Sequence, residues 1–344
     1  MDSRHNQQKS ITWINTIKAI SIVGVFFVHS QIHYGYMIAG LNCFIYPWYV
    51  NAFFFVSGYL LFWKQLSVPR IDEDRKLYIS MGGGKTLIIN IIYRIIIPSI
   101  IFSIIEFIPS CLIQGREINI GFALYKTIGG GTYWFTSALV VAELILLLLF
   151  MTRRRNIWFY ACICLFIGTL SYVLLRLGVL KSGVWSYRQG LISLIFLALG
   201  GLYWRYEKQV DRLMKWWFAV PLFVVYVAII FWCKNTNPLI STLEILPLGF
   251  VTSIVACLLL AWLCKRMPET KSLTFIGQNS IGFYFLSGAL PIPLGILAQK
   301  AIPDISVWVM LAIFVICLIA AYIAVIIINR WIPWLWDLRL IRKK

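Results

Sequence analysis

A lysine and a histidine, Lys18 and His29, stand eleven residues apart in the first apolar stretch of the chain, residues 11–30. Eleven residues of α-helix turn by about 1100° and rise by about 16 Å, so both side chains share one helix face. A cation inside a bilayer is tolerated mainly where it faces a protein interior or a wet cavity, and histidine exchanges protons near neutral pH. The pair therefore predicts a functional site. The competing interpretation is that Lys18 reaches the nearer headgroups and His29 meets the far interface.

Other charged residues fall in apolar runs. Glu143 is well inside the run 133–151, where a carboxylate is a functional hypothesis with a structural hydrogen bond as the alternative. Arg94, in the run 87–113, is expected near the depth of Lys18. Two cations at one depth predict an anionic ligand, for which phosphate is the candidate. Glu106 is expected at the outer end of its span, within reach of water.

The composition predicts an all-α, polytopic membrane protein. Of 344 residues, 60% are hydrophobic and only 13% charged, and the apolar residues form long blocks. We expect about ten transmembrane helices in a single domain, residues 1–344. The expected spans are 11–31, 46–63, 87–113, 133–151, 156–175, 188–205, 216–233, 242–264, 273–294 and 306–329.

The net charge of +18 is interpreted as topological. The cations concentrate in alternate loops and in the two tails, which places both termini in the cytoplasm and predicts a multi-pass protein of the inner membrane. We therefore expect no nucleic-acid partner. The first apolar run is too long for a cleavable signal peptide. Trp331, Trp334 and Trp336, with the basic tail, are expected to rest on the inner membrane surface.

The longest expected cytoplasmic loop, residues 64–86, ends in GGGKT. It lacks the first glycine and the preceding strand of a phosphate-binding P-loop, so that motif is excluded. Lys85 remains a candidate contact for an anionic ligand. His29 and His33 are four residues apart, but the chain has just one other histidine, so we expect no metal site.

Five segments, in this order, resemble the membrane acyltransferase-3 family. WINTIKAISIVGVFFVHS is similar to its first helix, with a basic residue, ten residues and then His. The others are FFFVSGYLL (53–61, containing Ser57), YRIIIP (93–98), YWFTSALV (133–140) and FIGQNSIGFYFL (275–286, containing Tyr284).

The chain departs from the family pattern at four positions. Asn15 stands where the family often has Asp, Lys18 where it has Arg, and Ile91 where it has a second Arg. Ser287 stands where a His commonly closes the late motif. Lysine cannot donate two parallel hydrogen bonds to a phosphate as arginine does, so we expect several cations to share the phosphate contacts. The missing histidine weakens the case for a role of the late helix.

The resemblance implies O-acylation of a carbohydrate by acetyl-CoA, with no metal cofactor. Lys18, Arg94 and Lys85 are then the expected donor contacts. His29 is the expected general base, or the nucleophile of an acyl-histidine route. Glu143, Ser57 and Tyr284 are further candidates.

The acceptor implied by the resemblance is an envelope or capsular glycan or its lipid-linked precursor. The sugar, the acyl group beyond acetyl and the oligomeric state stay open. The alternatives are a transporter using the intramembrane charges, for which no inverted repeat is seen, and a catalytically silent relative.

Overall fold

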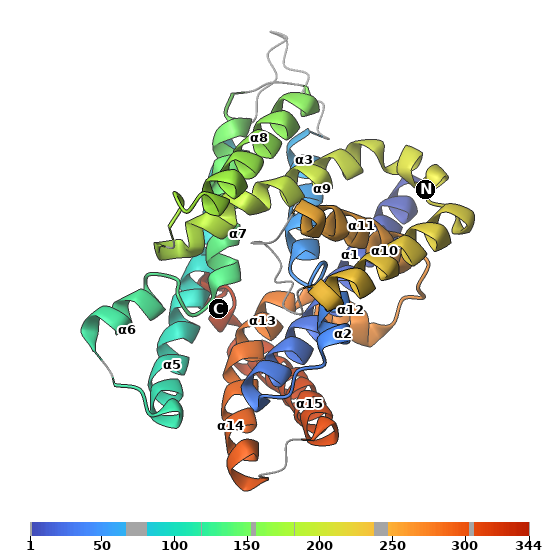
Figure 1. Ribbon diagram of the computed structural model, residues 1–344. Helices are drawn as coiled ribbons and strands as arrows, with labels where there is room; N and C mark the ends of the chain where they lie inside the picture. Colours follow the sequence, from blue (N-terminus) through green and yellow to red (C-terminus); the bar gives the residue numbers. More distant parts are fainter. Residues whose placement is uncertain are drawn as a thin grey trace.

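The computed structural model describes residues 2–66, 81–117, 119–152, 156–181, 183–236, 247–302 and 306–343. Within these residues the chain is helical and contains no strand (Figure 1). The elements are α1 (Asp2–Tyr34), α2 (Ala39–Ile45), α3 (Asn51–Leu66), α4 (Met81–Ile91), η1 (Ile92–Ile96), α5 (Ile97–Gln114), α6 (Ile120–Thr127), α7 (Trp134–Phe150), α8 (Ile157–Arg176), η2 (Val184–Ser186), α9 (Tyr187–Leu213), α10 (Trp216–Thr236), α11 (Pro247–Cys264), α12 (Lys271–Gln278), α13 (Ser280–Ala289), α14 (Pro291–Ala301), α15 (Val307–Trp331), η3 (Pro333–Leu335) and η4 (Leu338–Lys343).

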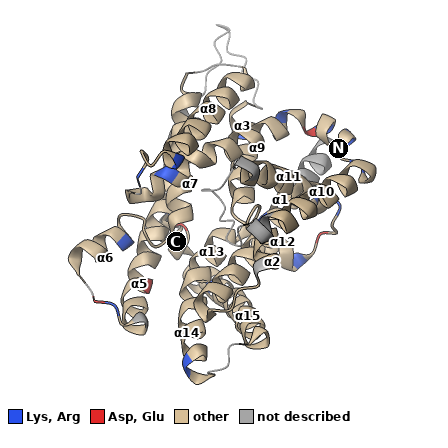
Figure 2. Ribbon diagram, viewed as in Figure 1, with Lys and Arg blue, Asp and Glu red and all other residues tan. Residues whose placement is uncertain are grey.

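Several of these helices can cross a membrane. In the described part of the chain, five are long and apolar enough, and a sixth span results if α9 and α10, bent by 104°, count as one. The five are Thr12–Tyr34, Thr86–Ile113, Ile157–Arg176, Ser280–Ala301 and Val307–Trp331. Charged residues are sparse along the helices (Figure 2). The all-helical membrane class is confirmed, whereas ten spans and cytoplasmic termini remain predictions.

The third expected span is a continuous helical path from α4 to α5 with one widened turn. Pro98 has no amide hydrogen for the carbonyl of Arg94, four residues earlier, and its ring crowds that carbonyl. The π-helical turn η1 (Ile92–Ile96) accommodates this mismatch and contains Arg94. Because α4 begins at Met81, GGGKT lies in a helix and not in the expected loop.

Helix α1, which carries Lys18 and His29, is surrounded by other helices. It packs against α12, α13, α14 and α15, and also against α3 and α11 (Figure 1). Glycines permit backbone contact at two of these helices. A Cβ on Gly277 of α12 would lie 2.0 Å from the carbonyl oxygen of Asn15, and one on Gly295 of α14 would lie 2.7 Å from the backbone of His33. Such close approach is how membrane helices gain packing energy.

Helices α3 and α9 form the other tight pair. A Cβ on Gly200 would lie 1.9 Å from the carbonyl oxygen of Phe55. The pair is also joined at one end by a hydrogen bond of 2.7 Å from the Tyr59 hydroxyl to Glu207. Lys265 of α11 adds an ion pair of 2.7 Å with Glu207. These contacts hold α3, α9 and α11 together.

We predict that Gly200→Ala destabilises the protein by about 1–3 kcal/mol or more, because the new methyl group overlaps backbone that cannot move aside. Gly121→Ala is the control: its Cβ would meet nothing closer than 3.7 Å, and alanine favours helix. Thermal unfolding in detergent should show a lower midpoint for the first variant only. Equal midpoints would contradict the contact.

Candidate functional site

The first part of the site is a cavity of about 330 Å³ bordered by α1, α3, α4 with η1, α7, α13 and the segment after α15. We call it the cationic cavity. Five residues predicted from the sequence meet there. They are Lys18, Ser57, Arg94, Glu143 and Tyr284. Lys64, Asn90, Gln278, Asn279 and Trp336 also line it.

Positive charge dominates the cationic cavity. Lys18 lies close enough to Arg94 and Lys64 for their charges to repel its ammonium. Glu143, only 8% exposed, is attracted to Lys64 across the cavity. Arg94 also forms an ion pair of 3.6 Å with Asp337. Like charges held together in a partly buried site favour a bound anion that neutralises them.

The second part is a cavity of about 270 Å³, which we call the histidine cavity. Its lining residues include His29, His33, Glu106, Arg116, Lys126, Tyr133, Tyr284 and Ser287. Nδ1 of His29 lies 2.8 Å from the backbone carbonyl oxygen of Ser287. A carbonyl only accepts, so Nδ1 carries the hydrogen and Nε2 of the neutral ring keeps its lone pair. This is the arrangement of a positioned base or nucleophile.

A proline explains why that carbonyl is available. In an α-helix the carbonyl of Ser287 would accept from the amide of residue 291, but Pro291 has no amide hydrogen. The one-residue interruption between α13 and α14 falls here, at Leu290, within the candidate span Ser280–Ala301. His29 supplies the missing donor. The cost of an unpaired backbone group in a membrane interior is thereby avoided.

A half-buried carboxyl group, that of Glu106, completes the histidine cavity. The Tyr133 hydroxyl lies 2.6 Å from Oε2 of Glu106 and 3.1 Å from the carbonyl oxygen of Phe285. The shorter contact is to Glu106, so the single hydroxyl hydrogen points to that carboxyl oxygen. Glu106 lies on α5, Tyr133 precedes α7, and the carbonyl belongs to α13. The contact brings three elements together at one wall of the cavity.

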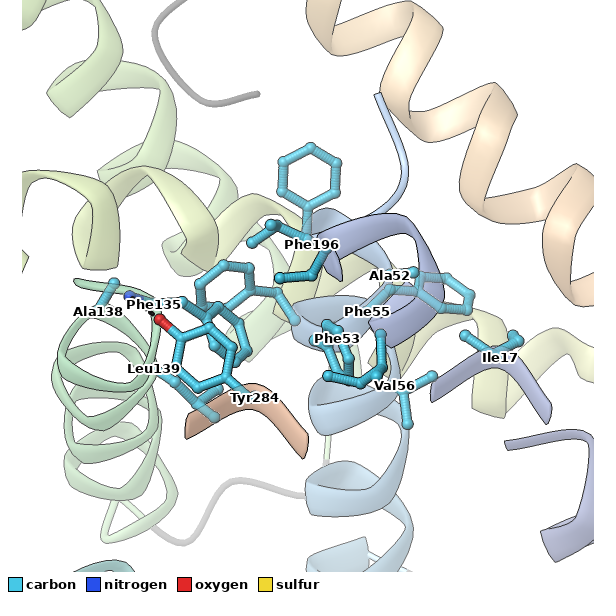
Figure 3. Packing of buried hydrophobic residues seen from close by; sticks show 14 of the residues in the cluster. Ile17, Ala52, Phe53, Phe55, Val56, Phe135, Ala138, Leu139, Phe196 and Tyr284 are labelled. Atoms are coloured by element: carbon cyan, nitrogen blue, oxygen red, sulfur yellow. Dashed lines mark hydrogen bonds between the residues drawn. The ribbon is translucent and has the colours of Figure 1, made fainter. Parts of the chain in front are cut away.

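Tyr284 lines both cavities. Its oxygen accepts a hydrogen bond of 3.3 Å from the amide of Phe135 at the start of α7. The two rings pack edge to face with centroids 5.2 Å apart, and Figure 3 shows Tyr284 against Phe135 and Leu139. Lys18 and His29, on one helix, therefore reach two cavities that meet at this tyrosine.

Some sequence expectations need correction. Ser287 was expected to weaken the role of its helix, yet its backbone carbonyl holds His29. Trp336 does not rest on the membrane surface: it stacks on Phe102, with centroids 5.0 Å apart, because an apolar slot inside the bundle accepts the ring. The side chain of Lys85 lies outside the described residues.

Sequence reasoning missed Glu106 as a site residue, although a carboxylate inside an apolar run was a usable signal. It also missed Lys64, placed in the loop but found on the wall of the cationic cavity. Among the described residues, no group of three or more His, Cys, Asp and Glu side chains is close enough to hold a metal ion.

Comparison with known proteins decides the family. The family model described as an acyltransferase domain, of the acyltransferase-3 type, matches residues 11–330. The chain belongs to this family. Membership and the apolar helices together indicate a multi-pass membrane acyltransferase. No curated protein and no solved structure matches the chain.

We predict that Pro291→Ala changes the tautomer of His29, because the new amide competes for the Ser287 carbonyl. The chain has three histidines, so ¹⁵N-histidine NMR can resolve them. The parent protein should show His29 protonated at Nδ1, and the variant an increased Nε2–H population. Pro293→Ala, on the same helix, is the control and should leave the signals unchanged. An unaltered tautomer in Pro291→Ala would contradict the explanation.

Proposed function

We propose that this acyltransferase moves an acetyl group from cytoplasmic acetyl-CoA to a hydroxyl of an envelope or capsular glycan or its lipid-linked precursor. One observation carries the proposal: a cationic cavity and a histidine cavity meet at Tyr284. Coenzyme A is a polyanion with a long, slender arm. The cations would hold its phosphates, and the arm would carry the thioester towards His29.

Nε2 of His29 accepts the proton of the acceptor hydroxyl as its oxygen attacks the thioester carbonyl carbon. The carbon–sulfur bond breaks, and the thiolate leaves and takes a proton to become the thiol of coenzyme A. In the second route Nε2 itself attacks, and the acceptor hydroxyl later displaces the acetyl group from it. Both routes need the same lone pair, so acetylated protein trapped by rapid quenching would distinguish them.

The histidine cavity suits a hydroxylated acceptor. Glu106 accepts hydrogen bonds, while Arg116 and Lys126 donate them, and Tyr133 and Trp134 offer aromatic surface. A sugar ring presents hydroxyls at its edges and C–H groups on its faces, which these groups match. The cation asymmetry of the loops supports a cytoplasmic donor side, an outward acceptor side and an inner-membrane location.

We predict that His29→Ala lowers acetyl transfer by at least ~100-fold, the low end for loss of a general base. Purified protein would be assayed with acetyl-CoA and a glycan acceptor. Thr16→Ala is the control on the same helix: its hydroxyl bonds the carbonyl of Thr12 and it lines neither cavity. Equal turnover in His29→Ala and the parent would contradict the catalytic assignment. Solute or proton flux that needs Glu143 and no coenzyme A would favour a transporter.

We predict that Lys18→Ala and Arg94→Ala each weaken coenzyme A binding by roughly tenfold, because each removes a charged phosphate contact. Isothermal titration of protein in nanodiscs measures the effect. Lys300→Ala, an exposed cation at the end of α14, is the control and should bind as the parent does. Unchanged affinity in both cavity variants would show that the phosphates are held elsewhere.

A further inference from the structure

The segment after α15 folds back onto the bundle. Pro333 follows the helix end, and the chain turns through η3 and η4. Here η4 packs against η1, and Trp336 contacts Phe102 of α5 and Phe285 of α13. Trp336 fixes this path, since its ring stacks on Phe102 within 5° of parallel and lines the cationic cavity. This segment lies beyond residues 11–330, the range matched by the family.

The same segment brings a second guanidinium next to Arg94. Nε of Arg339 donates to Oδ1 of Asp337 over 2.7 Å, and its Nη2 donates to Oδ2. Its Nη1 donates to the side-chain oxygen of Asn90, which lines the cationic cavity. Asp337 also contacts Arg94, whose Nε lies 3.6 Å from Oδ2, the same oxygen that accepts from Nη2 of Arg339. One carboxylate therefore links two arginines that come from distant parts of the chain.

The charge of this cluster is not balanced. The hydrogen bond from Arg339 is the main reason that the pKa of Asp337 lies below its usual range, so its carboxylate stays ionised at neutral pH. The single negative charge of Asp337 then faces the two positive charges of Arg94 and Arg339. The Arg94 contact engages Nε and leaves its terminal nitrogens outside that ion pair, and 57% of its side chain is exposed. The rim of the cavity therefore retains net positive charge and guanidinium donors.

We propose that Arg94 and Arg339 together bind a phosphate group of the thioester donor, with Asp337 setting the spacing of the two guanidiniums. This rests on the proposed function, in which the donor is an acyl-coenzyme A. Arginine matches phosphate oxygens with paired N–H donors, which lysine cannot do. Because Asp337 and Asn90 already hold Arg339 in place, little side-chain freedom is lost on binding. The donor site thus extends outside the region matched by the family.

Titration of coenzyme A into protein in nanodiscs tests this proposal. Arg339→Gln should raise the dissociation constant by about tenfold, the effect of losing one charged hydrogen-bonding group, and Arg339→Lys should recover part of the affinity. Arg330→Gln is the matched control, because Arg330 is an exposed arginine at the end of α15 that lies over Trp331. It should bind as the parent does.

Pantetheine, which carries no phosphate, is the second ligand. It should bind the parent and Arg339→Gln equally, because the variant removes only the phosphate contact. Weaker pantetheine binding in the variant would indicate a collapsed cavity and overturn the proposal. If the parent protein binds coenzyme A and Arg339→Gln binds it with the same affinity, this proposal is overturned and the proposed function is not. Parent protein that does not bind coenzyme A would contradict the proposed donor as well.

Discussion

The hydrogen bond between Nδ1 of His29 and the Ser287 carbonyl is the interaction on which the site depends. In a membrane interior every backbone polar group needs a partner inside the protein, so a proline in a spanning helix is tolerated where a neighbour satisfies the freed carbonyl. Here Pro291, inside the candidate span Ser280–Ala301, removes a backbone donor, and His29 replaces it. One contact therefore satisfies the carbonyl, fixes the tautomer of the imidazole and anchors α13 to α1. Tyr284, one turn earlier on α13, is held by the same packing at the junction of the two cavities.

Close backbone packing makes that contact possible. Gly277 lets α12 approach Asn15, and Gly295 lets α14 approach His33, so the two helices flanking α13 both lie directly on α1. The helix that carries Lys18 and His29 is consequently enclosed by its neighbours, and both side chains face cavities. A second irregular turn, η1, serves the same end at Arg94, where Pro98 widens the helix. Two prolines thus shape the two halves of the site.

The sequence predicted the helices and part of the site because both depend on local patterns. Apolar blocks mark helices, and helical periodicity places Lys18 and His29 on one face. The shared depth of Lys18 and Arg94 follows from their positions in two runs, and the structure brings both to one cavity. The contact of His29 with Ser287 joins residues 258 positions apart, and no local pattern encodes it.

The position of the C-terminal segment likewise could not be predicted from local sequence patterns. Its tryptophans and cations resemble an interfacial tail, and that composition fits a membrane surface equally well. Only the complete fold shows that a slot beside Phe102 accepts Trp336 and brings Asp337 to Arg94. Glu106 is a different case, because its carboxylate was visible in an apolar run while its partner, Tyr133, was not identifiable from spacing.

A structure of the protein with a non-hydrolysable acetyl-CoA analogue, determined by cryo-electron microscopy in nanodiscs, tests the central claim most directly. We predict phosphate density at Lys18 and Arg94 in the cationic cavity, with the acyl end of the arm at Tyr284, directed towards His29. Density for the analogue away from this cavity, or an acyl end pointing away from Tyr284, would contradict the account.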